Sequence, residues 1–179
     1  MIDSLHIRRE LRPGDLGAIV ALHGRLYSRE YGVDSTFEAM VAAAVTEAGS
    51  RGWPTEREGI WIVEREGVLV GSLALTDDGD AGVIRWFVLD PDLRGRGLGR
   101  RLLAELLAKA RDVGHARLCL ETFSDLRAAA HLYREVGFEI TWEDTRPRWG
   151  RDSITYQHYE LELIRTEAES KLDPVAGSA

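Results

Sequence analysis

The sequence contains a single cysteine, Cys119, among its 179 residues. One cysteine excludes a disulfide within the chain and a metal site built from several cysteines. The five histidines have no spacing typical of metal ligands, so no metal is expected. The sequence also lacks the apolar core of a signal peptide and any apolar stretch near the roughly 20 residues that span a bilayer. We therefore expect a cytoplasmic protein with no membrane partner.

Basic residues are in the minority. Lys and Arg number 23 against 30 Asp and Glu, which gives a formal net charge of -7. This balance disfavours a nucleic acid partner and mildly favours a cationic one. One segment opposes the trend, because residues 93–101 hold four arginines and three glycines.

The remaining composition is that of a folded protein, with 44% hydrophobic and 30% charged residues. At this length, folding buries about 70% of the surface that the unfolded chain exposes, so a core forms without disulfides. We expect one domain over residues 1–164 and a flexible tail over residues 165–179.

Hydrophobic periodicity predicts the order β-α-α-β-β-β-α-β-α-β-β. This order predicts an α/β (α+β) domain with a central mixed, mostly antiparallel sheet of about six or seven strands flanked by four helices. Asp15 is expected to cap the first helix, a capping box Ser35-x-x-Glu38 the second, and Ser124 or Asp125 the fourth. The strands are expected at residues 5–9, 60–63, 68–75, 83–89, 117–122, 138–142 and 155–163.

The Gly/Arg segment follows a strand and opens an amphipathic helix. Helix N-termini bind anions, and glycines allow a phosphate to approach the backbone, so a phosphate site is one interpretation. The spacing fits neither a P-loop nor the dinucleotide-binding pattern GxGxxG. A solvated turn that only caps the helix is the alternative.

Two segments resemble the GNAT superfamily of N-acetyltransferases. Residues 88–103 resemble its acetyl-CoA-binding motif, whose core Q/R-x-x-G-x-G/A is matched by Arg94, Gly97 and Gly99. Residues 128–138 resemble the next segment of that superfamily, in which a helix ending in Tyr-x-x-x-Gly-Phe flanks the thiol end of the cofactor. In the N-terminal third, residues 22–32 are similar to GNAT domains fused to MarR-type repressors.

The resemblance implies how acetyl-CoA would bind. Backbone N–H groups of the glycine loop would hold the pyrophosphate, the arginines would reach the 3′-phosphate, and the pantetheine arm would pair with a strand that a bulge separates from its neighbour. A backbone N–H near Leu89 would polarise the thioester carbonyl. The expected cofactor-binding residues are Phe87, Val88, Leu89, Arg94, Gly95, Arg96, Gly97, Leu98, Gly99 and Arg100.

Two residues are candidates for proton transfer. Tyr133 matches the acid position of the superfamily and would protonate the leaving thiolate, unless it is a core tyrosine. Glu121 lies where some members carry a base, although it is equally interpretable as a rim charge. Position 126 is Leu, where many members have Asn.

The acceptor side carries a weaker pattern. His23, Tyr27 and Tyr31 share one helix face that either lines the acceptor pocket or packs in the core. Trp149, between Arg148 and Arg151, is expected in a loop over residues 146–151, near the thiol end of the cofactor or in a homodimer contact.

These features predict an acetyl-CoA-dependent N-acetyltransferase that transfers the acetyl group directly to a primary amine of a small molecule. A protein or peptide amine is the alternative within this class. A catalytically silent acyl-CoA-binding sensor is the alternative from another class.

Overall fold

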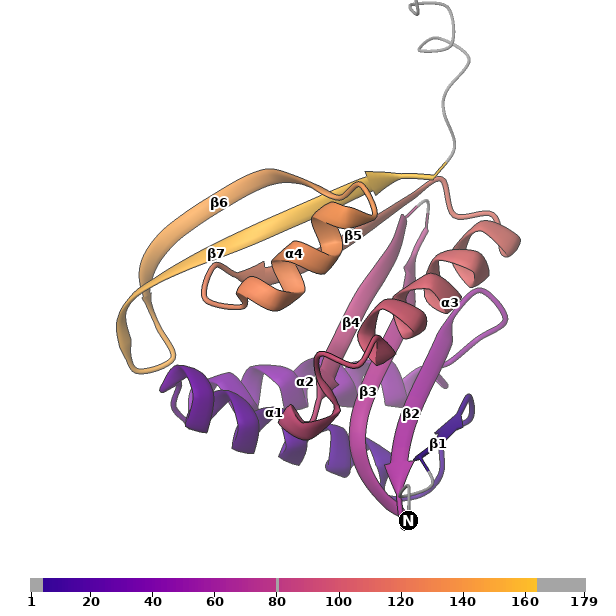
Figure 1. Cartoon of the computed structure of the whole chain (residues 1–179), viewed down its shortest axis with the longest axis horizontal. Coiled ribbons are helices and arrows are strands. Elements are labelled where there is room, and N and C mark those ends of the chain that lie inside the picture. The colour runs from indigo at the N-terminus through magenta and orange to yellow at the C-terminus, as the bar shows by residue number, and fades with distance from the viewer. Residues whose placement is uncertain (1–4, 80, 164–179) are drawn as a thin grey trace, which may run out of the picture.

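The strands of the chain form one seven-stranded sheet in the order β1-β2-β3-β4-β5-β7-β6 (Figure 1). This computed structural model describes residues 5–79 and 81–163, and the expected tail lies outside them. Strands β4 and β5 pair in parallel and every other pair is antiparallel, which confirms the predicted mixed sheet. The strands are β1 Leu5–Arg8, β2 Gly59–Arg65, β3 Val68–Asp78, β4 Ala81–Leu89, β5 Arg117–Phe123, β6 Glu139–Arg148 and β7 Arg151–Glu162.

Helices cover both faces of the β1–β5 part of the sheet. Ile60 and Ile62 of β2 join the cluster built from α1 and α2, whereas Trp61 and Val63 join the cluster built from α3 and α4. The apolar run of β2 is continuous because this strand is buried on both faces. The helices are α1 Asp15–Tyr31, α2 Ser35–Ser50, α3 Leu98–Asp112 and α4 Arg127–Glu135, with a short 3₁₀ turn at Pro91–Leu93.

The predicted helix caps are wrong in detail. Gly14 precedes α1, and the Asp15 carboxylate instead pairs with the buried Arg8 at 2.9 Å. The cap of α2 is Asp34, which accepts from Thr36 N at 2.9 Å. Leu126 precedes α4 without a side-chain cap. Each carboxylate near a helix start has several possible partners, and spacing along the chain does not select among them.

The expected loop over residues 146–151 is a two-residue hairpin turn. Strands β6 and β7 reach Arg148 and Arg151, and the turn residues Trp149 and Gly150 have φ of 52° and 76°. Two successive positive φ values are typical of a type I′ turn. The hairpin tip docks on the start of α2, where Asp34 N donates to the Trp149 carbonyl at 2.9 Å.

The described ranges 5–79 and 81–163 contain no helix with the length and apolar character needed to cross a bilayer. Within the same ranges, no group of three His, Cys, Asp or Glu side chains is arranged to hold a metal ion.

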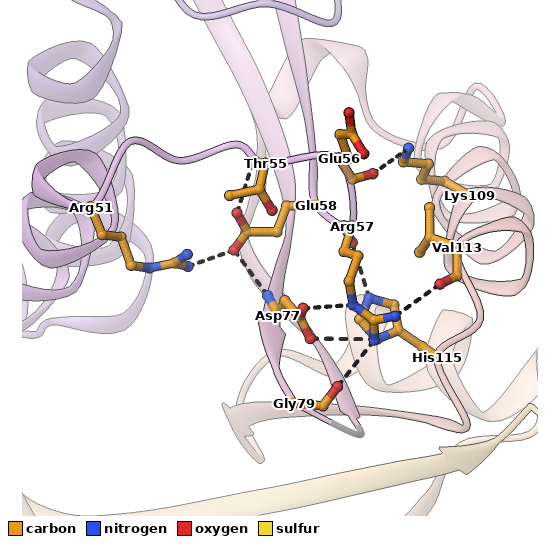
Figure 2. Close-up of polar contacts among 10 residues, drawn as sticks. All are labelled: Arg51, Thr55, Glu56, Arg57, Glu58, Asp77, Gly79, Lys109, Val113 and His115. Carbon is orange, nitrogen blue, oxygen red and sulfur yellow. Dashed lines mark hydrogen bonds and ion pairs between the residues drawn. The ribbon is translucent and has the colours of Figure 1, made fainter.

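A buried polar network joins the segment before β2 to the β3–β4 turn and to the end of α3 (Figure 2). His115 is fully buried, with Nε2 3.0 Å from the Arg57 carbonyl and Nδ1 3.2 Å from Arg57 Nη2. A guanidinium only donates, so in this contact Nδ1 is the acceptor, and Nε2 donates to the Arg57 carbonyl. Arg57 also donates to Asp77 Oδ2 at 2.7 Å and to the carbonyls of Val113 and Gly79 at 3.1 Å and 3.0 Å.

Glu58 is the buried carboxylate of this network. It accepts from Arg51 at 2.5 Å, from Thr55 N at 2.8 Å and from Asp77 N at 3.0 Å. Burial acts to raise the pKa of Glu58, but these hydrogen bonds outweigh it and hold the pKa below its ordinary value. The polar groups at this end of the sheet therefore largely satisfy one another.

Candidate active site

Strands β4 and β5 separate partway along their length. Their parallel pairing runs from Ala81 opposite Arg117 to Ile84 opposite Leu120, and no further pair follows among the described residues. Beyond this point, the edge of β4 that faces β5 is left without a strand partner. A fork in a sheet exposes backbone groups to a ligand, which is how a cleft forms inside a covered sheet.

A bulge in β4 accompanies the fork. The β3–β4 register shifts between Ser72 and Ala74, and Trp86 opposite this shift has φ of 48°. The fully buried Ser72 hydroxyl donates to the Trp86 carbonyl at 2.6 Å, which stabilises the bulge. The bulge and the separation of the strands confirm the expectation drawn from the resemblance.

One cavity, of about 410 Å³, lies between β4, the start of α3 and α4. It is lined by Phe87, Val88, Leu89, Arg94, Gly95, Gly97, Gly99 and Arg100 from the expected cofactor set, together with Tyr27, Tyr31, Leu126, Ala128, Ala129, His131, Leu132 and Glu135. The strand edge and the glycine loop, which the sequence linked only through the resemblance, therefore share one cavity.

The glycine loop suits a phosphate group. Gly95 and Gly97 have φ of 72° and 82°, and Gly97 directly precedes α3, whose first N–H groups have no partner within the helix. A Cβ added at either glycine would meet open space, so the loop backbone is accessible. These features fit the diphosphate of coenzyme A.

The arginines of the loop differ in their surroundings. Arg94 lines the cavity, but its guanidinium is held by Glu30 at 2.6 Å and 3.0 Å and by the Leu89 carbonyl at 2.9 Å. Arg100 lines the cavity and pairs with Glu135 at 2.8 Å. Arg96 is exposed and Leu98 packs against the core, and neither lines this cavity.

A second cavity, of about 220 Å³, opens at the fork on the side of α1 and α2. Helix α2 contributes Phe37, Met40, Val41 and Ala44, at the spacing of a single helix face. The other lining residues are His23, Tyr27, Val83, Ile84, Arg85, Trp86, Phe87, Leu120, Glu121, Thr122, Phe123, Leu126, Tyr133, Trp149 and Tyr156. Tyr27, Phe87 and Leu126 line both cavities, so the two cavities adjoin.

Tyr133 lies in this second cavity with 5% of its surface exposed. Its ring is 6.5 Å from Phe87 and 6.0 Å from Tyr159, and its hydroxyl makes no hydrogen bond within the described residues. Burial, followed by the nearby Tyr159, raises the pKa of Tyr133 above its ordinary value. The phenol therefore keeps its proton at neutral pH and has no internal acceptor for it.

Glu121 lines the same cavity from β5, with about half of its side chain (51%) exposed. Its Oε2 accepts from the Tyr156 hydroxyl at 2.9 Å, and its Oε1 lies 4.0 Å from His158 Nδ1. Burial, then the charge of Glu121, raises the pKa of Tyr156, so this phenol remains a donor to the carboxylate. The structure therefore brings Tyr133 and Glu121 to one cavity.

The α1 side chains divide between the two cavities. His23 lines the second cavity, and burial lowers its pKa to about 4, so this imidazole is neutral at pH 7. Tyr27 lines both cavities and stacks on Phe37 with ring centroids 4.7 Å apart, whereas Tyr31 lines only the first cavity, that of the glycine loop. The helix face predicted to hold His23, Tyr27 and Tyr31 therefore serves both predicted roles: it lines cavities and it packs against other aromatic side chains.

Several lining residues escaped the sequence analysis. Arg85 is the single charge inside the apolar segment 83–89, and that interruption was a usable signal. Tyr156 reaches Glu121 only through the β5–β7 register. Trp149, by contrast, is expected from the sequence near the thiol end of the cofactor or in a homodimer contact, and it lines this cavity through the turn that docks on α2. Pairings of distant strands leave no local pattern in the sequence.

Comparison with known proteins agrees with this geometry. Residues 25–138 match the acetyltransferase (GNAT) family. The L-amino acid N-acyltransferase MnaT of Escherichia coli (strain K12) is 32% identical in an alignment of 173 positions that covers 90% of this chain and 97% of that protein. An amino-acid acetyltransferase of Ectopseudomonas mendocina (strain ymp) is 36% identical over 104 residues, 57% of this chain and 23% of that protein.

Solved structures share the fold. The structure of yncA from Salmonella typhimurium with acetyl-CoA superposes with a TM-score of 0.69 at 19% identity, covering 91% of this chain and 96% of that one. An N-acetyltransferase from Staphylococcus aureus Mu50 gives a TM-score of 0.67 at 20% identity, covering 90% and 99%. The narrower resemblance to repressor-fused domains stays a prediction. The chain belongs to the acetyltransferase (GNAT) family and is an acyltransferase.

Proposed function

We propose that this protein transfers the acetyl group of acetyl-CoA directly to the primary amine of a small molecule. The observation that carries the proposal is the fork between β4 and β5, where the glycine-loop cavity and the cavity with Tyr133 and Glu121 adjoin. Acetyl-CoA supplies an activated thioester. The two cavities provide separate approaches to one point between the strands.

In this proposal, the chain binds the donor through backbone groups. The N–H groups at the start of α3 hold the diphosphate, and the free edge of β4 over Phe87–Leu89 pairs with the pantetheine amides. Arg100 lines the cavity and binds the 3′-phosphate in place of Glu135, with which it forms an exposed ion pair in the free protein. Arg94 instead keeps the loop attached to α1 through Glu30.

Proton transfer is assigned to two side chains. Glu121 accepts the proton that an ammonium acceptor must lose before its nitrogen attacks the thioester carbonyl. The neutral amine attacks the thioester carbonyl, the C–N bond forms and the C–S bond breaks, and the Tyr133 hydroxyl gives its proton to the departing sulfur. The new amide nitrogen loses its second proton, which returns through solvent to the Tyr133 oxygen, so coenzyme A leaves as a thiol and the phenol is restored. The lack of an internal acceptor for the Tyr133 hydroxyl supports this assignment.

Two observations favour a small acceptor over a protein. The cavity that holds Tyr133 and Glu121, called the acceptor-side cavity from here on, has a volume of about 220 Å³, which is smaller than the roughly 300–1,000 Å³ of drug-sized ligand sites. The MnaT protein and the Ectopseudomonas protein are named for amino-acid substrates. A compact amine with few rotatable bonds fits these features.

Calorimetric titration with acetyl-CoA and with coenzyme A, followed by thiol-release assays, tests the proposal. The acceptor panel holds L-amino acids, their amides, polyamines and peptides with free N-termini. Amine-dependent thiol release with small acceptors is the expected result. Release only with peptides would support a peptide N-acetyltransferase, and acetyl-CoA binding without release from any acceptor would support the sensor function and contradict this proposal.

A further inference from the structure

The acceptor-side cavity contains one charge of each sign. Among the described residues that line it, Arg85 and Glu121 carry formal charge at pH 7, since burial keeps His23 neutral. The other lining groups are apolar or aromatic, apart from hydroxyls such as Thr122 and Tyr156. A ligand that fits this lining presents both a cation and an anion close together.

The two charges occupy equivalent positions on neighbouring strands. Ile84 and Leu120 form the last parallel pair, so Arg85 and Glu121 are the next residue on each strand, where the strands separate. Arg85 belongs to β4 and Glu121 to β5, and both line the cavity on the side of α1 and α2.

Within the described residues, Arg85 and Glu121 do not form an ion pair with each other. The Glu121 carboxylate is held by the Tyr156 hydroxyl, and Arg85 Nε donates to Thr76 Oγ1 at 3.2 Å. Within the described residues, Arg85 makes no ion pair, and its two terminal nitrogens make no hydrogen bond. Each charge is thus anchored at one atom. Arg85 keeps its two terminal nitrogens for a ligand, and Glu121 keeps Oε1, which lies 4.0 Å from His158 Nδ1 and makes no hydrogen bond within the described residues.

We propose that the acceptor is an α-amino acid with an apolar side chain, whose carboxylate binds Arg85 while its ammonium group faces Glu121. A guanidinium matches a carboxylate through two parallel hydrogen bonds. The apolar side chain of the bound amino acid lies against the face of α2 formed by Phe37, Met40, Val41 and Ala44. This inference rests on the proposed function and adds which residues recognise the amine acceptor.

Matched acceptors isolate the carboxylate. L-Phenylalanine and L-leucine are compared with their amides, which keep the amine and the side chain but lose the negative charge. Steady-state thiol release at saturating acetyl-CoA gives kcat/KM for each acceptor in the wild type, Arg85→Gln, Arg85→Lys and Arg117→Gln. Arg117 is an exposed arginine at the other end of the same strand pair and is the matched control.

Arg85→Gln is expected to lower kcat/KM for the amino acids by about 10- to 100-fold, the usual effect of losing a charged hydrogen bond. The amides should change by less than about threefold, because they do not use the guanidinium. Arg85→Lys should retain part of the activity and Arg117→Gln all of it. Glycine and L-aspartate should be poorer acceptors than L-leucine in the wild type, because neither fills the apolar wall.

The outcomes separate the two proposals. An equal effect of Arg85→Gln on acids and amides, or no effect on either, overturns the carboxylate assignment while amine-dependent release still supports the proposed function. Turnover of other amines without any turnover of amino acids also overturns the carboxylate assignment and still supports the proposed function. Absence of release with every acceptor overturns both proposals. Thermal unfolding and acetyl-CoA affinity of Arg85→Gln, each expected to match the wild type, exclude misfolding as the cause.

Discussion

The two ends of the β4–β5 strand pair are built in opposite ways. At one end, Gly82 leaves room for the side chains packed around it, because a Cβ there would lie 2.7 Å from the Leu118 side chain and 3.1 Å from the His115 side chain. The neighbouring polar groups of Arg57 and Glu58 are bound within the protein. At the other end, the bulge at Trp86 accompanies the loss of pairing, and charges and backbone groups are left available.

The difference indicates that one end of the strand pair contributes to stability and the other end to ligand binding and catalysis. Buried polar groups that satisfy one another fix a geometry, whereas groups with free atoms can bind a ligand. The closed end is expected to respond to mutation through the free energy of unfolding. The open end is expected to respond through affinity and turnover.

The largest effect is expected from Gly97→Glu at the open end. Positive φ at this position and a carboxylate beside the phosphate site should weaken acetyl-CoA binding by at least about 1,000-fold. Calorimetry measures this loss. Gly114→Glu is the control, because Gly114 has a similar φ of 80° but follows α3 at its far end. If both variants weaken binding equally, the loop is not the phosphate site.

Tyr133→Phe is expected to lower kcat by about 100-fold through loss of the proton donor. The affinity for acetyl-CoA should stay within about twofold, because the ring and its packing are retained. The control is Tyr159→Phe, which removes a buried hydroxyl bound to Gln157 at 3.2 Å outside both cavities. That change should affect stability and spare kcat. Normal turnover in Tyr133→Phe would show that Tyr133 is a core residue.

At the closed end, His115→Ala should lower the free energy of unfolding by about 2 kcal/mol. The substitution opens a cavity and removes the two hydrogen bonds between His115 and Arg57. Urea unfolding measures the change, and the acetyl-CoA affinity of the folded variant should be unaltered. A loss of affinity with unchanged stability would contradict the separation of the two ends.

Glu58→Gln is expected to cost about 1 kcal/mol at pH 7 and less in acid. The pKa of Glu58 is held below its ordinary value of 4.5, so its contribution to stability is present above pH 4.5 and is lost as the pH falls through the folded pKa. Urea unfolding at pH 7 and near pH 3.5 tests this. A stability difference that is constant with pH would show that the carboxylate is not the stabilising form.

Local patterns predicted the order of elements but not the contacts between them. The hydrophobic pattern differs clearly between strand segments such as residues 60–63 and helix segments such as α3. The order of strands and helices therefore follows from the sequence. The glycines and arginines of residues 93–101, at the start of a helix, indicate an anion site, and the resemblance favours this interpretation over a solvated turn. The partnership of Glu121 with Tyr156, the placement of Arg85 beside Glu121 and the positive φ of Trp149 depend on register and turn geometry. These are set by tertiary packing, which a single sequence does not display.

Hydrogen exchange with and without acetyl-CoA compares the two ends most directly. Binding at the fork predicts slower exchange of the backbone amides of residues 87–89 and 95–100 when acetyl-CoA is present. The amides around Asp77 and His115 should exchange at the same rate in both samples. Protection confined to the closed end, or none over residues 87–100 at saturating acetyl-CoA, would contradict the assignment of the fork as the donor site.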